Sequence, residues 1–282
     1  LHRQFAKVTV LNGINAQVWP GQVIALLGKN GAGKTTLLET ILGFGFPSAG
    51  EARLWQQEAT QIAVETKQRI GFVPQQDELL PSLTGNDHLK LFKSFRSHWN
   101  QPLVDKLIAE WLIPMDMHTG KMSVGQRQKL SILLALAHEP ELLILDEPVA
   151  SLDPIARRQF LQQLVDIAAD ENRAVIFSTH IVSDVERVAN QVWMLRDGDL
   201  VYQGGLDELK ESFVRVTLSF DHPVTQKIHW PHLLKQKSSG NQTQLTIERW
   251  QPGMEQQLAQ AFFAQVQVEF LSLEDIFLEM NP

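Results

Sequence analysis

The chain has 282 residues, with 25 Lys and Arg against 32 Asp and Glu, and a formal net charge of −7. This length suits about two domains of roughly 150 residues each. A composition that is 44% hydrophobic and 20% charged is typical of a folded globular protein and argues against disorder. The acidic balance disfavours a broad nucleic-acid-binding surface, which needs surplus positive charge.

Other sequence features limit where the protein can act. No apolar run approaches the roughly 20 residues of a membrane-spanning helix, and no basic-plus-apolar signal peptide is present. The chain lacks cysteine, which excludes disulfides, thiol nucleophiles and thiolate metal sites. It begins with Leu1 rather than Met, so we expect leading residues to be missing. These features predict a soluble, intracellular protein with two domains.

The first part of the chain alternates apolar runs with turn-forming residues. It predicts strands at 8–18, 22–27 and 70–73, with a turn at Pro20-Gly21, a glycine-rich loop at 28–33 and a helix at 34–42. Residues 77–137 have helical periodicity with breaks at Pro81, Pro102 and Pro114. We expect this region to be mostly helical.

The next part predicts a buried sheet. Strands are expected at 142–145 and 174–177, a helix at 157–169, and a hairpin formed by 192–195 and 200–202 around the turn 196–199. Strands that alternate with helices indicate an α/β core.

The composition changes after Gly204-Gly205, which divides the chain into domains at 1–205 and 206–282. The tail predicts strands at 213–220 and 244–247, a polar loop through 237–240, and a helix at 254–265. We expect the tail to be a small C-terminal α/β accessory domain.

Residues 28–35 match the phosphate-binding loop G-x-x-x-x-G-K-[ST]. Lys34 would reach the β- and γ-phosphates, and the Thr35 hydroxyl would ligate Mg²⁺. The other nucleotide-binding candidates are Gly28, Asn30, Gly31, Ala32, Gly33 and Thr36. An incidental glycine-rich turn is disfavoured because this loop joins an apolar strand to a helix.

Asp146 and Glu147 follow the apolar run 142–145. Strand ends of this kind face the ligand crevice of an α/β sheet. Asp146 suits Mg²⁺, and Glu147 suits a general base that orients the attacking water. The alternative is that these acids only begin the next helix. It is disfavoured because the same chain contains a phosphate-binding loop.

Residues 122–128, Met-Ser-Val-Gly-Gln-Arg-Gln, resemble the signature motif of ATP-binding cassette ATPases. Together with Gln75 and the segments 151–154 and 178–180, the pattern covers about residues 1–205 and identifies the chain as a member of that family. The resemblance implies a P-loop NTPase cassette with a parallel-sheet core, an antiparallel β edge and a helical subdomain at about 77–138. It implies ATP and Mg²⁺ as cofactors.

The resemblance also implies roles for single residues. Phe5 would stack on adenine, Gln75 would contact Mg²⁺ or water, and His180 would contact the γ-phosphate. Ser123, Gly125 and Gln126 would bind ATP held by a second copy, and Asp153 would link the two sites.

The signature motif departs from the family pattern at Met122 and at Val124, which replaces a glycine, and Ser151 stands where glycine is common. A β-branched residue disfavours positive φ, so we expect ordinary helical or extended angles at Val124.

The implied function is ATP hydrolysis by this chain and a second copy of the same or a homologous ATPase subunit. The two subunits would close around two ATP and power a separately encoded membrane permease, an exporter. The chain would lie at the cytoplasmic face of the bacterial plasma membrane and bind no nucleic acid. It would dock the permease through the helical region after Gln75, which includes residues 79–84; the alternative is that the apolar residues of this segment only anchor the loop. Residues 272–278 resemble the C-terminal ending of the exporter branch. The alternatives are a soluble cassette ATPase acting on ribosomes or nucleic acid, and a sensor that binds ATP without hydrolysing it. No sequence feature names the transported substrate.

Overall fold

The structure is a computed structural model that describes residues 1–222 and 227–281. It contains two compact units, Leu1–Gln203 and Gly204–Pro282. Within the described residues, no helix has both the length and the apolar character that crossing a membrane requires.

The first unit is built on a six-stranded sheet in the order β10-β9-β3-β8-β7-β6. Its strands are β3 (Val23–Leu27), β6 (Ile70–Val73), β7 (Leu142–Leu145), β8 (Ala174–Thr179), β9 (Gln191–Arg196) and β10 (Asp199–Gly205). The pairs β3/β8, β3/β9, β7/β8 and β6/β7 are parallel. Every residue of β3, β7 and β8 is buried, because a parallel sheet is covered on both faces. The predicted α/β core is confirmed.

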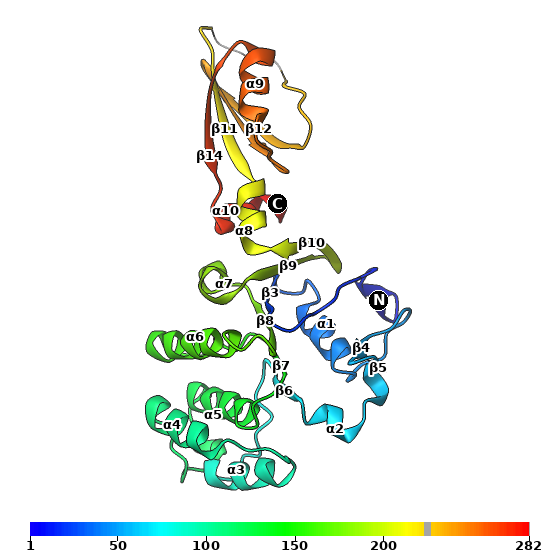
Figure 1. The fold of residues 1–282 in the computed structure, drawn as a ribbon, viewed down its shortest axis with the longest axis vertical. Coiled ribbons are helices and arrows are strands. Elements are labelled where there is room, and N and C mark those ends of the chain that lie inside the picture. The colour runs from blue at the N-terminus through cyan, green and yellow to red at the C-terminus, as the bar shows by residue number, and fades with distance from the viewer. Residues whose placement is uncertain (223–226, 282) are drawn as a thin grey trace. The chain divides into compact units, whose positions relative to one another are not determined.

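Helices cover both faces of this sheet (Figure 1). On one face α1 (Lys34–Ile41) packs Leu37 and Leu38 against Ile24 and Leu26 of β3. On the other face α5 (Val124–Leu136) packs against β6, and α6 (Pro154–Ala168) packs against β8. The remaining helices of this unit are α2 (Val64–Lys67), α3 (Gly85–Ser94), α4 (Gln101–Trp111) and α7 (Val182–Val188), with 3₁₀ turns at Ala59–Gln61 and Thr119–Lys121.

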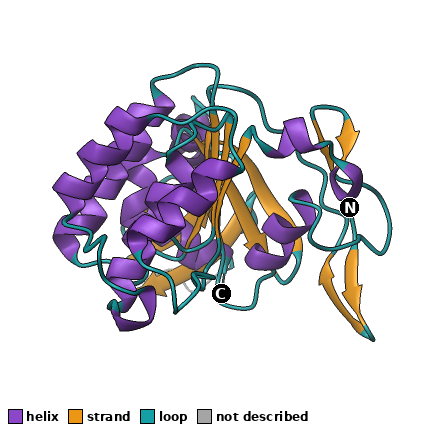
Figure 2. Cartoon of the chain, turned by 90° about the horizontal axis from the view of Figure 1, so that it is seen from below, coloured by secondary structure: helices purple, strands orange, loops and turns teal. Residues whose placement is uncertain are grey.

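Hairpins complete the first unit. The short pairs β1 (Arg3–Phe5)/β2 (Val8–Leu11) and β4 (Arg53–Leu54)/β5 (Gln57–Glu58) are antiparallel and lie apart from the main helical layer (Figure 2). The strand predicted at 8–18 therefore ends at Leu11. The predicted hairpin β9–β10 is confirmed, and its turn residues Asp197 and Gly198 both have positive φ, as a tight two-residue turn requires.

The second unit is a four-stranded antiparallel sheet in the order β12-β13-β11-β14. Its elements are α8 (Leu206–Ser212), β11 (Val214–Ser219), β12 (Leu233–Ser239), β13 (Gln242–Ile247), α9 (Met254–Phe262), β14 (Gln265–Phe270) and α10 (Leu273–Met280). Val214, Val216 and Leu218 alternate with more exposed residues along β11. They form the core of this unit with Leu245, Ile247 and Leu258.

Two predictions for the tail are wrong. The polar loop expected through 237–240 is largely part of β12, an edge strand whose Lys235 and Lys237 face solvent. An edge strand tolerates polar residues that the alternation rule does not anticipate. The helix expected at 254–265 ends at Phe262, because Phe263 has φ +50° and Gln265 begins β14.

Candidate nucleotide-binding and hydrolysis site

The loop between β3 and α1 needs its glycines. Gly31 and Gly33 have φ of +83° and +104°, a region that favours glycine. At Gly28 a Cβ atom would lie 2.6 Å from the Leu195 carbonyl oxygen, so a side chain does not fit there. The backbone at 28–33 therefore adopts a course that other residues would resist.

Helix α1 begins directly after this loop and has no side-chain cap. Gly33 occupies the N-cap position, and no acidic residue lies in the first turn. The first N–H groups of a helix have no partner within the helix and bind anions readily. Thr35 and Thr36 lie in this first turn. The start of α1 is thus suited to a phosphate group.

The predicted site residues follow neighbouring strands. Gly28 follows β3, His180 follows β8, Asp146 follows β7, and Gln75 lies two residues after β6. Because these four strands are adjacent and parallel, their carboxyl ends lie at one edge of the sheet. Binding sites of open α/β sheets occupy this edge.

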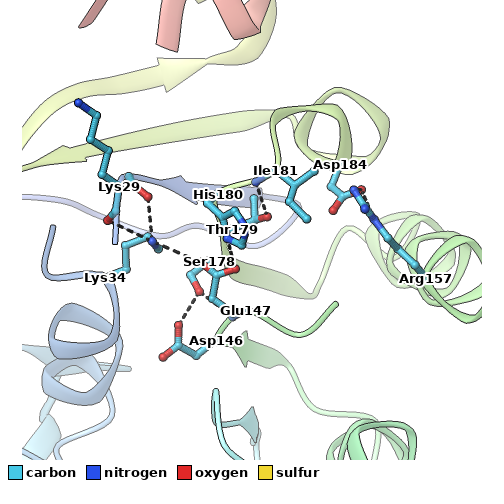
Figure 3. Close-up of polar contacts among 11 residues, drawn as sticks. Lys29, Lys34, Asp146, Glu147, Arg157, Ser178, Thr179, His180, Ile181 and Asp184 are labelled. Atoms are coloured by element: carbon cyan, nitrogen blue, oxygen red, sulfur yellow. Dashed lines mark hydrogen bonds and ion pairs between the residues drawn. The ribbon is translucent and has the colours of Figure 1, made fainter. Parts of the chain in front are cut away.

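Lys34, Glu147 and His180 form a contact cluster at this edge (Figure 3). The Glu147 carboxylate lies 3.3 Å from Lys34 Nζ through Oε1 and 2.9 Å from His180 Nδ1 through Oε2. Lys34 Nζ also donates to the Gly28 carbonyl oxygen at 2.8 Å. The structure thus joins the phosphate-loop cation, the expected general base and the expected γ-phosphate sensor.

Ser178 holds the two acidic residues together (Figure 3). Its hydroxyl donates to Asp146 Oδ1 at 2.5 Å and accepts from the Glu147 backbone N–H at 2.7 Å. Asp146 and Glu147 are only 2% and 6% exposed, and Glu147 has φ +48°. Sequence reasoning gave Ser178 no role of its own, although a hydroxyl at the end of a buried apolar strand was a signal for one.

The residues expected to hold Mg²⁺ suit that ion. Thr35, Gln75 and Asp146 offer hydroxyl, amide and carboxylate oxygens, and Mg²⁺ prefers oxygen ligands. In the part of the chain that the structure describes, no group of three His, Cys, Asp or Glu is arranged to enclose a metal. Mg²⁺ is commonly held by one or two carboxylates together with phosphate oxygens and water. The donor set therefore fits an ion that binds with a nucleotide.

One carboxylate oxygen of Glu147, Oε1, can accept a further hydrogen bond. Apart from the ion pair with Lys34, its buried Oε1 accepts no hydrogen bond from the described residues. A buried carboxylate oxygen normally has a hydrogen-bond partner. Oε1 can therefore accept a hydrogen bond from a water molecule, as a general base must.

Phe5, the expected adenine contact, lies at the end of β1 and is 49% exposed. The Arg3 guanidinium carbon lies 4.7 Å from the centre of its ring. A second cation or aromatic system can use the remaining face of the ring.

The signature residues begin α5. Ser123 accepts from the Gln126 N–H at 3.2 Å, and Gln126 Oε1 accepts from the Ser123 N–H at 2.8 Å, which forms a capping box. Val124 lies inside the helix and has no positive φ, so the expectation for its angles is confirmed. A Cβ atom on Gly125 would lie 3.0 Å from the Ser151 carbonyl oxygen, so the backbones approach closely there.

Arg127 connects the signature helix to the segment after Gln75. Its Nε donates to Asp77 Oδ2 at 2.9 Å, and its Nη1 donates to the Met122 carbonyl oxygen at 2.8 Å. Sequence reasoning did not identify this pair, because 50 positions separate the partners.

Asp153 caps α6 by accepting from the Ile155 and Ala156 N–H groups at 3.0 and 2.9 Å. The Ala156 bond, helped by Lys129, holds the pKa of this carboxyl below its usual range. Among the described residues, no hydrogen bond or ion pair joins Ser123, Gln126 or Asp153 to the Lys34–Glu147–His180 cluster. The chain thus presents two separate groups of predicted site residues.

Comparisons with known proteins agree with this geometry. The family model described as "ABC transporter" matches residues 11–150, and one described as "AAA domain, putative AbiEii toxin, Type IV TA system" matches residues 119–183. The chain is 31% identical over 213 residues to the bacitracin transport ATP-binding protein BcrA of Enterococcus faecalis, covering 74% of this chain and 68% of that protein. It is 32% identical over 209 residues to the Nod factor export ATP-binding protein I of Burkholderia pseudomallei, covering 72% and 68%.

Solved structures share the fold. The structure of an ATP binding subunit of an ABC transporter has a TM-score of 0.68 at 26% identity, covering 74% of this chain and 89% of that one. The dimeric ATP-binding cassette MJ0796 bound to ADP and Pi has a TM-score of 0.63 at 22% identity, covering 73% and 95%. Together with the sequence relatives, these likenesses establish that the chain belongs to the ATP-binding cassette transporter ATPases, with the exporter-type proteins among its relatives.

Proposed function

We propose that this chain is the ATP-hydrolysing subunit of an exporter, in which two copies enclose two ATP and drive a separately encoded membrane permease. The observation that supports hydrolysis most directly is the buried contact of Glu147 with both Lys34 and His180, beside the uncapped start of α1. This arrangement places a cation and an imidazole each in direct contact with the same carboxylate base.

Each residue of the cluster has a distinct task in this proposal. The N–H groups at the start of α1 and the Lys34 ammonium bind the phosphates. Thr35, Gln75 and Asp146 would hold Mg²⁺ when it binds with the nucleotide, and the ion would supply positive charge to the phosphates. Glu147 orients the attacking water through Oε1 and accepts its proton. His180 holds Glu147 Oε2 and faces the γ-phosphate.

A second copy completes the site in this proposal. Ser123 and Gly125 stand at the start of α5, a second helix N-terminus that suits an anion. They make no described contact with the first cluster, which is the arrangement expected if they serve ATP bound to another copy. The dimeric cassettes with the same fold are consistent with this view.

The segment 79–84 is proposed to contact the permease. Two hydrogen bonds fix its backbone at Leu80. The Leu80 N–H donates to His88 Nε2 at 3.0 Å, and the Leu80 carbonyl oxygen accepts from Thr119 Oγ1 at 2.7 Å. The Gly120 N–H donates to the Pro81 carbonyl oxygen at 3.1 Å. The Leu80 side chain remains 50% exposed. A rigid backbone that presents an apolar side chain suits docking of a helix.

The names of two relatives and the end of the chain support export as the direction of transport in this proposal. Bacitracin transport and Nod factor export name the activities of two of them, and residues 272–278 resemble the ending of the exporter branch. An exporter subunit of this kind acts at the cytoplasmic face of the bacterial plasma membrane.

The replacement Glu147→Gln tests the proposed mechanism. It keeps the shape of the side chain but removes the base, so we expect ATP binding to persist while kcat falls by about a hundredfold or more. The variant should also accumulate as an ATP-bound dimer in light scattering. Glu65→Gln, on exposed residue 65 of α2, is the matched control. Hydrolysis at the wild-type rate by Glu147→Gln would contradict the assigned role.

A further inference from the structure

The loop that bears His180 has little local anchoring. It leads from β8 into α7, a helix of seven residues whose N-cap Ile181 makes no side-chain capping bond. The local restraints are the bond from the Ile181 N–H to Thr179 Oγ1 at 3.0 Å and the bond from the Asp184 N–H to the Ile181 carbonyl oxygen at 3.2 Å. So short a helix is marginal on its own, and the side chain of His180 is half exposed. Tertiary contacts must therefore set where this loop lies.

Asp184 supplies such a contact in the first turn of α7. It is 1% exposed, and its Oδ1 accepts from Arg157 Nε at 2.9 Å and from Arg157 Nη2 at 2.6 Å (Figure 3). Its second oxygen, Oδ2, is buried and has no hydrogen-bond partner among the described residues. The planar guanidinium therefore provides a directional restraint on an otherwise uncompensated buried charge.

Arg157 belongs to the first turns of α6, directly after Asp153. Its N–H donates to the Asp153 carbonyl oxygen at 2.8 Å, and the Asp153 side chain caps the same helix. α6 and α7 also pack against each other. The ion pair thus ties Asp184, in the first turn of α7 and four residues after His180, to the helix that Asp153 caps.

We propose that Arg157 and Asp184 are positioning residues that hold His180 within hydrogen-bond distance of Glu147. The inference rests on the proposed role of His180. Movement of α6 at its Asp153 end would pass through the ion pair to the His180 loop. The pair therefore connects the segment expected to meet a second copy with the residue expected to sense the γ-phosphate.

The test replaces both residues of the Arg157–Asp184 ion pair with apolar residues, instead of removing only one of them. Arg157→Gln alone leaves Asp184 charged, buried and unpaired, and this variant can simply unfold. The double variant Arg157→Met with Asp184→Leu keeps the volume in apolar form, a change that buried ion pairs often tolerate. Arg158→Gln, on the exposed neighbour in the same helix, is the matched control.

Two measurements on the full chain test whether the Arg157–Asp184 pair positions His180. In steady-state hydrolysis we expect the double variant to retain its KM for ATP while kcat falls by about ten- to a hundredfold, as for a misplaced catalytic group. In hydrogen–deuterium exchange we expect faster exchange confined to residues 178–188. Arg158→Gln should change neither.

The outcomes separate this inference from the proposed function. A double variant with wild-type kcat and wild-type exchange at 178–188 would overturn the positioning role alone, provided that His180→Ala is inactive. Wild-type hydrolysis by His180→Ala would overturn both the role of His180 and the inference that rests on it.

Discussion

The Ser178 hydroxyl is the shared hydrogen-bond partner of Asp146 and Glu147, and Ser178→Ala removes it without adding volume. Ser178 is fully buried, so water cannot readily replace the lost bonds. The substitution leaves the Glu147 N–H without its acceptor and Asp146 Oδ1 without its donor. Glu147 also loses a restraint on its left-handed backbone conformation.

The expected loss of stability follows from these two lost hydrogen bonds. An unsatisfied buried N–H costs about 1–3 kcal/mol, and a lost hydrogen bond to a charged group costs about 1.5–3 kcal/mol. We therefore expect the free energy of unfolding to fall by about 3–5 kcal/mol. A domain of this size loses roughly 2–4 °C in Tm for each kcal/mol, so Tm should fall by about 10 °C. We also expect kcat to fall by more than about tenfold, because Glu147 is no longer held against Lys34 and His180.

Thermal unfolding with and without ATP, together with steady-state hydrolysis, measures both effects. Ser183→Ala is the matched control, because Ser183 lies nearby in α7 and is exposed. If Ser178→Ala unfolds within about 1 °C of the wild type and hydrolyses ATP equally fast, the reasoning from this hydroxyl is refuted.

Two further predictions concern the stability of the chain. Burial, with a smaller contribution from Arg96, lowers the pKa of His138 in the folded chain to about 4. In the unfolded chain a His has a pKa of about 6.5, so the unfolded chain binds this proton first as the pH falls. The free energy of unfolding should therefore decrease by about 3 kcal/mol as the pH falls from about 6.5 to 4. Urea titrations of His138→Gln should lack this part of the pH dependence, and a variant with the wild-type pH dependence would contradict the prediction. A chain truncated after Gly205 should remain folded and bind ATP, because the first compact unit ends at Gln203; aggregation with loss of ATP binding would indicate that the tail completes its core.

Local patterns in the sequence were sufficient for much of this protein. The loop 28–35 was predictable because glycine, lysine and threonine requirements are local to a strand–loop–helix unit. The buried strands β3 and β7 were predictable because they are uninterrupted apolar runs. The helical character of residues 77–137 was predictable because apolar residues recur there at helical spacing, and α3, α4 and α5 lie in this range. The polar edge strand β12 lacked such a pattern, so its residues 237–239 were predicted to be a loop.

The contacts that organise the site depend on the tertiary structure. Ser178 meets Asp146 and Glu147, and Arg157 meets Asp184, across 31 or 32 and 27 positions respectively. Neither pairing follows from spacing. The sheet order decides which strand ends lie beside Ser178, and the packing of α6 against α7 decides which residue Arg157 meets. The sequence by itself therefore determined which residues have the right chemistry, since propensities and short motifs act over a few residues. Only the tertiary structure decided which hydroxyl meets the two acids and which guanidinium meets Asp184, because the packing of strands and helices brings together residues that are far apart in the sequence.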